Sequence, residues 1–151
     1  MIATATATAT ATQPMTWQER RQFMNLMLLK QFTAQELDAL QRVYQLARDH
    51  TDTGGGSTAA KLLLGLYNGD RFPFDLTNLR RLDDQMLTHA LRVMEMDSRH
   101  CRAEVHVVLA AVTDDPAVQA RMECWAFDLG LKGRAKKGQI LEQRAQIGGG
   151  R

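Results

Sequence analysis

The amino-acid sequence predicts an all-α fold, a single compact bundle of five to seven helices with a central apolar helix. Three observations lead to this prediction. Two Thr-x-x-Glu capping boxes, Thr16–Glu19 and Thr33–Glu36, are typical of helix starts. The segment after Gly54–Gly56 is apolar in nearly every direction, as a helix at the centre of a fold is. Aromatic residues make up only 6% of the chain, and a core of leucine, methionine, alanine and valine favours helices over sheets.

The first two helices are expected directly after the capping boxes. Apolar residues at helical spacing extend the first to about Lys30 and the second to about Asp49. Because the link between them is very short, the two helices should pack antiparallel or cross sharply. The first helix also has more leucine and methionine than one core-facing stripe needs. Such a surface either fills a core or adapts to a partner, and a homodimer seam along this helix is one alternative.

The middle of the chain is expected to form a loop, a central helix and an elbow. The loop is His50–Gly56, because its three glycines disfavour a helix. Ser57 or Thr58 would then cap a helix that ends at Tyr67. The segment Phe72–Phe74 contains a proline that excludes a helix before it, so its aromatic side chains are expected at the edge of the core.

Acidic residues are expected to start the remaining helices. The segment 99–113 is open between strand and helix, and its helical neighbours favour helix. The last helix, starting at an acidic cap with proline in its first turn, should end at Gly130. The predicted caps are Asp75 or Thr77 for a short helix, Asp83 or Asp84 for a long one, and Asp114–Asp115 before Pro116 for the last; Ser98 is also interpreted as a cap.

The chain of 151 residues is interpreted as one helical domain between two tails. Residues 1–14 include five Ala-Thr pairs and are expected to be a disordered low-complexity tail. Residues 15–130 form the domain. Residues 131–151 are expected to be a basic flexible tail, because six basic residues oppose one acidic residue there, a net charge of +5. The rest of the chain then carries −3.

The run Gly54–Leu82 also carries a resemblance. Its leucine-rich helix, its Asn68-Gly69 stop and the phrase FDLTNL at 74–79, which leads into an Asp-rich helix start, resemble small uncharacterised helical proteins of bacterial plasmids, integrative elements and phages. The resemblance covers Gly54–Met94. It implies an origin in a mobile element and favours binding proteins that act on DNA, host machinery or host defence. It implies no activity and assigns no role to any residue.

The candidate catalytic and metal-binding patterns all have simpler interpretations. On one helix, His100 and Glu104 would share a face as half of a metal site, but His106 would point elsewhere. A salt bridge or an exposed polar face explains them better. The glycine loop before Lys61 lacks the spacing of a P-loop. We therefore predict no catalytic residues, no metal and no cofactor.

The chain is expected to work in the cytoplasm, without a membrane. It has no run of about 18 apolar residues and no charged signal-like start. Its two cysteines, Cys101 and Cys124, lie in apolar helical patterns and are interpreted as buried thiols of a reducing compartment.

The function hypothesis is a non-enzymatic interaction protein of the mobile-element type, which binds and blocks or adapts a host protein complex, for instance as an inhibitor of host defence. One alternative is a small DNA- or RNA-binding accessory protein, because a basic flexible arm can neutralise phosphates. A metal-dependent enzyme is a disfavoured alternative that needs His100, Glu104 and His106 to converge. The candidate binding residues for the first two hypotheses are Arg80, Arg81, Lys132, Arg134, Lys136 and Lys137.

Overall fold

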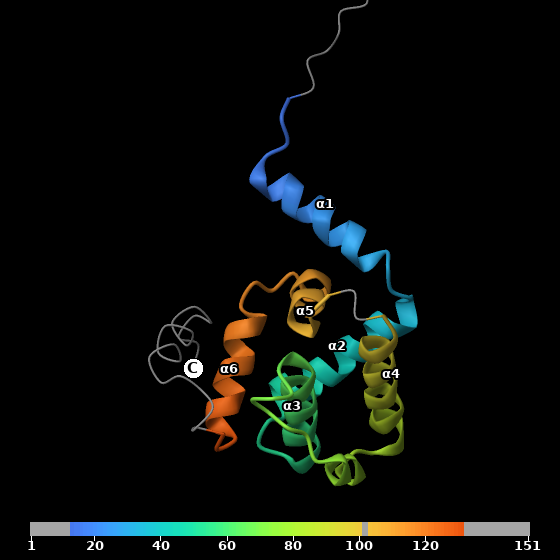
Figure 1. Ribbon diagram of the computed structural model, residues 1–151, viewed down its shortest axis with the longest axis vertical. Coiled ribbons are helices and arrows are strands. Elements are labelled where there is room, and N and C mark those ends of the chain that lie inside the picture. The colour runs from blue at the N-terminus through green and yellow to red at the C-terminus, as the bar shows by residue number, and fades with distance from the viewer. Residues whose placement is uncertain (1–12, 101–102, 132–151) are drawn as a thin grey trace, which may run out of the picture.

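A computed structural model describes residues 13–100 and 103–131, and the fold in this part of the chain is all-α (Figure 1). No strand occurs within it, so the predicted fold class is confirmed. The predicted tails fall almost wholly outside the described residues. The elements are α1 (Trp17–Leu29), α2 (Ala34–Asp49), α3 (Gly54–Tyr67), the 3₁₀ helix η1 (Leu76–Arg81), α4 (Asp84–His100), α5 (Val105–Thr113) and α6 (Val118–Asp128).

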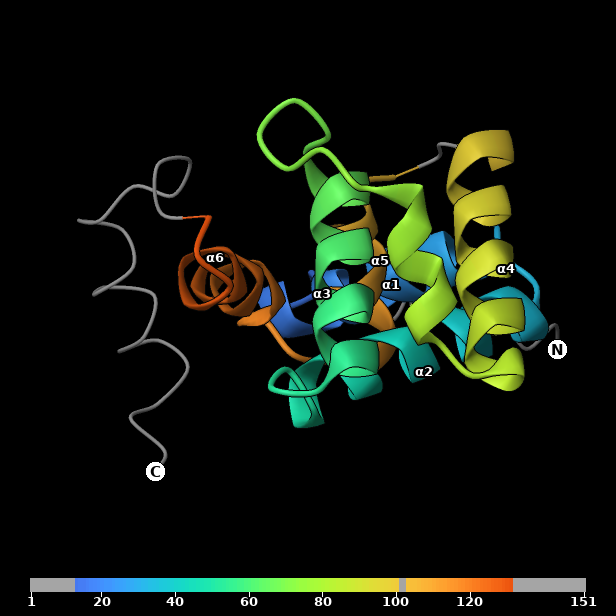
Figure 2. The ribbon, with the colours of Figure 1, turned by 90° about the horizontal axis from the view of Figure 1, so that it is seen from below.

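Helix α3 lies at the centre of the bundle, as its apolar sequence predicts. It packs against α2, α4, α5, α6 and η1. Figure 2 shows η1 between α3 and α4, with α2 crossing beneath them. The side chains of Leu62, Leu63 and Leu64 are all buried, although they point in different directions around the helix.

Both predicted capping boxes are present. At α1, Thr16 Oγ1 accepts a hydrogen bond from the Glu19 N–H at 3.2 Å, and Glu19 Oε2 accepts one from the Thr16 N–H at 2.7 Å. At α2, Thr33 and Glu36 make the same reciprocal pair, each at 3.1 Å. The chain changes direction sharply between the two helices (Figure 1).

The predicted start of α3 is wrong. The helix begins at Gly54, and its cap is Thr53, whose Oγ1 accepts a hydrogen bond from the Gly56 N–H at 3.0 Å. The three glycines therefore form the first helical turn instead of a loop. Gly56 is needed there because a Cβ atom at that position would lie 1.6 Å from the His50 carbonyl oxygen. The close backbone contact thus explains why glycine occupies this position despite its weak helix propensity.

The elbow and the caps around it agree with the sequence. Phe72 is buried and Phe74 is half-buried, so both aromatic rings pack at the edge of the core. Asp75 caps η1, with its Oδ1 accepting a hydrogen bond from the Thr77 N–H at 2.8 Å. Asp83 Oδ1 accepts one from the Met86 N–H at 2.7 Å at the start of α4.

Two boundaries in the second half differ from the predictions. Residues 105–113 are helical, as favoured, but Ser98 lies within α4 and does not cap a helix. Helix α6 begins at Val118, and Asp115 caps the turn before it by accepting a hydrogen bond from the Ala117 N–H at 2.9 Å. The predicted stop at Gly130 is confirmed, because its φ of 81° suits glycine.

Replacing Gly56 with alanine is expected to destabilise the protein strongly. The new Cβ atom would overlap the backbone of His50, which cannot move aside as a flexible side chain can. We expect a loss of about 3 kcal/mol or more in the free energy of unfolding. Urea denaturation followed by circular dichroism measures this loss.

Gly54→Ala is the matched control. Its new Cβ atom would meet Arg81 Cδ at 3.8 Å, an ordinary contact. Alanine is the better helix former, so this variant should gain about 0.5 kcal/mol. Equal losses at the two positions would mean that glycine is not required by the contact with His50.

Candidate interaction surface

Helix α1 exposes most of its large apolar side chains. It has no buried residue, in contrast to α2 and α3. A surface helix normally turns such residues toward the core. The exposed ones are Trp17 (86% exposed), Phe23 (53%), Met24 (65%), Leu26 (59%) and Met27 (47%).

The bundle partly covers another side of α1, which does not carry these exposed apolar residues. Helix α1 packs on α5 and extends past the rest of the bundle (Figure 1). Its partly covered residues are Asn25, Leu28 and Leu29. Clustered apolar side chains are thus left in water, although an asparagine lies on the covered side. Exposed apolar residues that gather on one side are typical of interaction sites, so this side of α1 is the candidate surface.

One part of this surface combines an aromatic ring with cations. Trp17, Arg20, Arg21 and Met24 line an open hollow of about 450 Å³ together with Gln18. The guanidinium of Arg20 lies over the Trp17 ring, 5.8 Å from its centroid. Within the described part of the chain, no carboxylate pairs with Arg20 or Arg21. We call Trp17, Arg20, Arg21 and Met24 the aromatic–cationic patch.

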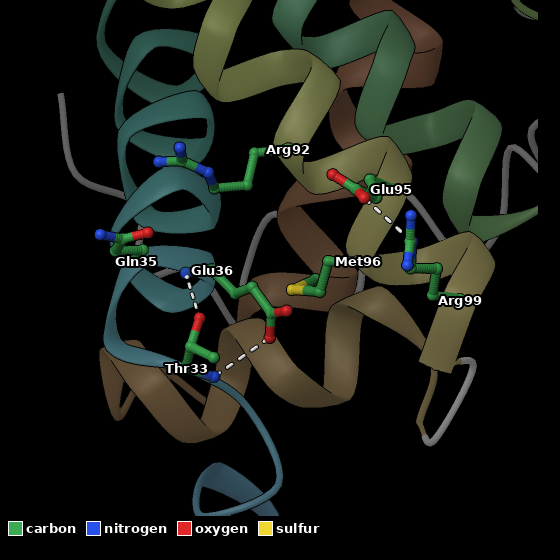
Figure 3. Close-up of a pocket in the computed structure, with 7 residues that line it drawn as sticks. All are labelled: Thr33, Gln35, Glu36, Arg92, Glu95, Met96 and Arg99. Carbon is green, nitrogen blue, oxygen red and sulfur yellow. Dashed lines mark hydrogen bonds and ion pairs between the residues drawn. The ribbon is translucent and has the colours of Figure 1, made fainter.

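A second hollow, of about 290 Å³, lies between the start of α2 and the C-terminal half of α4 (Figure 3). Its charges compensate one another, because Arg92 and Arg99 oppose Glu36 and Glu95. Glu95 pairs with Arg99 at 2.9 Å, and Glu36 caps its own helix through Thr33. Its polar groups therefore serve the fold, and the hollow offers no single charge to a ligand.

The candidate residues Arg80 and Arg81 are exposed at the end of η1. They lie in the last turn of this six-residue helix, where cations offset the negative end of the helix dipole. The exposed carboxylates of Asp83 and Asp84 follow directly. The other candidate residues, Lys132, Arg134, Lys136 and Lys137, lie outside the described residues. Of the predicted site residues, the structure therefore places only Arg80 and Arg81.

A buried polar centre joins α3, the elbow and α6, and the sequence reasoning missed it. Glu123 is only 5% exposed, and its carboxylate accepts two hydrogen bonds from Arg71, at 2.7 and 2.8 Å. The Tyr67 hydroxyl donates to Glu123 at 3.1 Å and accepts from Gln119 at 3.0 Å. Burial and the charge of Glu123 raise the pKa of Tyr67. The ion pair therefore fixes the elbow to α6.

The residues of the metal hypothesis do not share a helix. Helix α4 ends at His100 and α5 begins at Val105, so Glu104 lies in the break between them. The His106 ring packs edge-on against Tyr67, with 5.1 Å between centroids, and burial lowers its pKa. In the described ranges, no group of three or more His, Cys, Asp or Glu residues is arranged to hold a metal ion. Cys124 is buried, as predicted.

Residues 13–100 and 103–131 contain no helix that is both long enough and apolar enough to cross a bilayer.

Comparison with known proteins places most of the bundle in a family. The model of DUF7673, a family of unknown function, matches residues 37–126, which is more than half of the chain. The match runs from α2 to α6 and leaves α1 outside. No curated protein and no solved structure matches the chain.

Breaking the buried ion pair is expected to destabilise the bundle. Glu123→Ala leaves the Arg71 guanidinium, whose side chain is 30% exposed, without this carboxylate, at a cost of about 2 kcal/mol. Urea denaturation of Glu123→Ala, Arg71→Ala and the double variant measures the coupling between the two residues. Strictly additive losses would show that the pair does not hold the elbow.

Asp97 should make the stability depend on pH. Burial raises the pKa of this carboxyl group, and the charge of Glu104 adds to the effect. The folded state therefore disfavours the charged form that exists at pH 7. Asp97→Asn removes this charge and is expected to raise the melting temperature at pH 7. The gain should shrink as the pH falls through the raised pKa and then the unfolded-state value, because the wild-type carboxyl group becomes neutral. A gain that stays constant from pH 7 to pH 3 would contradict this assignment.

Proposed function

We propose that this chain, which belongs to the DUF7673 family of unknown function, is a non-enzymatic interaction protein that binds a partner protein through α1. The observation that carries the proposal is the exposure of Trp17 and Met24 on a helix that leaves its apolar side in water. Tryptophan and arginine are enriched among the residues that dominate binding energy at interfaces. Both occur in the aromatic–cationic patch.

The patch also suggests the chemistry of the partner. An apolar surface is needed to bury Trp17 and Met24, and carboxylates beside it would pair with Arg20 and Arg21. Such charge pairs contribute mainly to association rate and specificity, whereas the buried aromatic ring contributes most of the affinity. The partner surface is therefore apolar at its centre and acidic at its rim.

A host protein complex is the proposed origin of this partner. Support comes from the likeness of Gly54–Met94 to proteins of plasmids, integrative elements and phages. Occupying a surface of a host complex, and so blocking or adapting it, needs a stable helical body and one exposed binding face. A cytoplasmic setting fits this role.

Binding to nucleic acid through Arg80 and Arg81 is the competing hypothesis. The adjacent Asp83 and Asp84 weigh against it, because exposed carboxylates repel phosphates. Titration of the full chain with duplex DNA at increasing salt separates the two. Neutralised phosphates would give an affinity that falls steeply with salt concentration.

The experiment for the protein-binding proposal compares variants of the full chain. Wild type and Trp17→Ala are used to capture proteins from the cells that encode this chain, and the captured protein is then purified and titrated. We expect one stoichiometric partner whose affinity falls at least tenfold, by about 1.4 kcal/mol or more, with Trp17→Ala.

Arg80→Ala/Arg81→Ala is the matched control, because it removes two exposed cations far from α1. It should leave the affinity unchanged. A partner that binds Trp17→Ala as tightly as the wild type, or that is lost with the arginine control, would refute binding through the aromatic–cationic patch.

A further inference from the structure

A second side of α1 has a pattern that the aromatic–cationic patch does not use. Glu19, Phe23, Leu26 and Lys30 are separated by four, three and four residues, the spacing of a helix seam that faces a second helix. All four side chains are exposed. Met27 flanks them and is 47% exposed. We call Glu19, Phe23, Leu26 and Lys30 the α1 seam.

The spacing of the seam, four, three and four residues, is symmetric, so its positions keep the same spacing when the helix direction is reversed. Two copies of α1 placed antiparallel therefore bring the four positions into register. Each Phe23 is then level with the partner's Leu26, and each Glu19 is level with the partner's Lys30. A parallel pair would instead set Glu19 against the partner's Glu19, so the charges select the antiparallel arrangement.

The two charged ends of the seam are available for such pairing. Both hydrogen bonds that Thr16 donates to Glu19 end on Oε2, at 2.7 and 3.0 Å, and they hold this carboxylate in place. Glu19 Oε1 and the Lys30 ammonium have no ion-pair partner in the described part of the chain. Lys30 continues the helical backbone, with φ −62° and ψ −17°, so it stays on the line of the seam.

We propose that the α1 seam is a self-association surface, on which a second copy of this chain packs antiparallel through Phe23 and Leu26 and closes both ends with Glu19–Lys30 ion pairs. The seam and the aromatic–cationic patch lie on different sides of α1, so pairing leaves Trp17 and Met24 exposed. The proposal does not rest on the proposed function. A dimer with the patch exposed would offer two binding sites to a partner.

Sedimentation equilibrium of the full chain over a range of concentrations tests the proposal. The wild type should form a dimer, and Phe23→Glu should be monomeric because two carboxylates would then enter the centre of the seam. Met24→Glu is the matched control, since it puts the same charge on an exposed apolar residue of the same helix outside the seam. It should dimerise like the wild type. A monomeric wild type, or equal losses in the two variants, would overturn the proposal.

Charge exchange tests the antiparallel register. Lys30→Glu and Glu19→Lys should each weaken dimerisation about tenfold, because each replaces two symmetric attractions with repulsions. The double variant Glu19→Lys/Lys30→Glu restores opposite charges and should dimerise more tightly than Glu19→Lys alone. Because both of these variants lack the capping box, the comparison between them isolates the effect of charge pairing. A double variant no tighter than Glu19→Lys would overturn the antiparallel seam. Both dimerisation experiments use this chain alone, without a partner protein. The self-association proposal can therefore fail while the proposed function stands.

Discussion

The whole bundle depends on the close contact between the first turn of α3 and the end of α2. At Gly56 the helix lies directly against the backbone of His50, with no space for a Cβ atom. This contact joins α3 closely to the end of α2, and α2, α4, α5 and α6 pack around α3. Leu62, Leu63 and Leu64 of α3 are buried, and the removal of such apolar surface from water is the main force that stabilises the fold. The buried Arg71–Glu123 pair extends the same packing by tying the elbow to α6.

The parts of the fold that the sequence predicted are those with local causes. The boxes at Thr16 and Thr33 and the cap at Asp75 involve residues two or three positions apart, so their spacing reveals them. The start of α3 was predicted wrongly. Local propensity assigns Gly54–Gly56 to a loop, and the prediction overlooked Thr53, whose hydroxyl caps this turn through the Gly56 N–H. The contact that requires glycine at position 56 is visible only in the structure. The break between α4 and α5 likewise follows no strong local signal, because the residues around it suit a helix.

The candidate site was predicted less well, because it depends on which side of α1 the bundle covers. The excess of leucine and methionine on this helix is visible in the sequence. The side on which α5 packs is not, since it is set by contacts between segments about 80 residues apart. Arg80 and Arg81 were selected by residue type, although the carboxylates of Asp83 and Asp84 that weigh against phosphate binding follow directly in the sequence. The Arg71–Glu123 pair joins residues 52 positions apart, and the sequence around Glu123 does not identify its partner.

Helix α1 links the two proposed surfaces energetically. It has 13 residues and none of them is buried, and isolated helices shorter than about 12–15 residues are marginal in water. Its order therefore comes from the Thr16–Glu19 capping box and from packing on α5. A second copy on the seam stabilises the same helical backbone that presents Trp17 and Arg20 to a partner. The first binding event then supplies part of the free energy that is needed to order the α1 backbone for the second. Self-association and partner binding should therefore strengthen each other by the same factor. Placing both surfaces on one exposed helix thus makes the binding of one partner sensitive to the presence of the other.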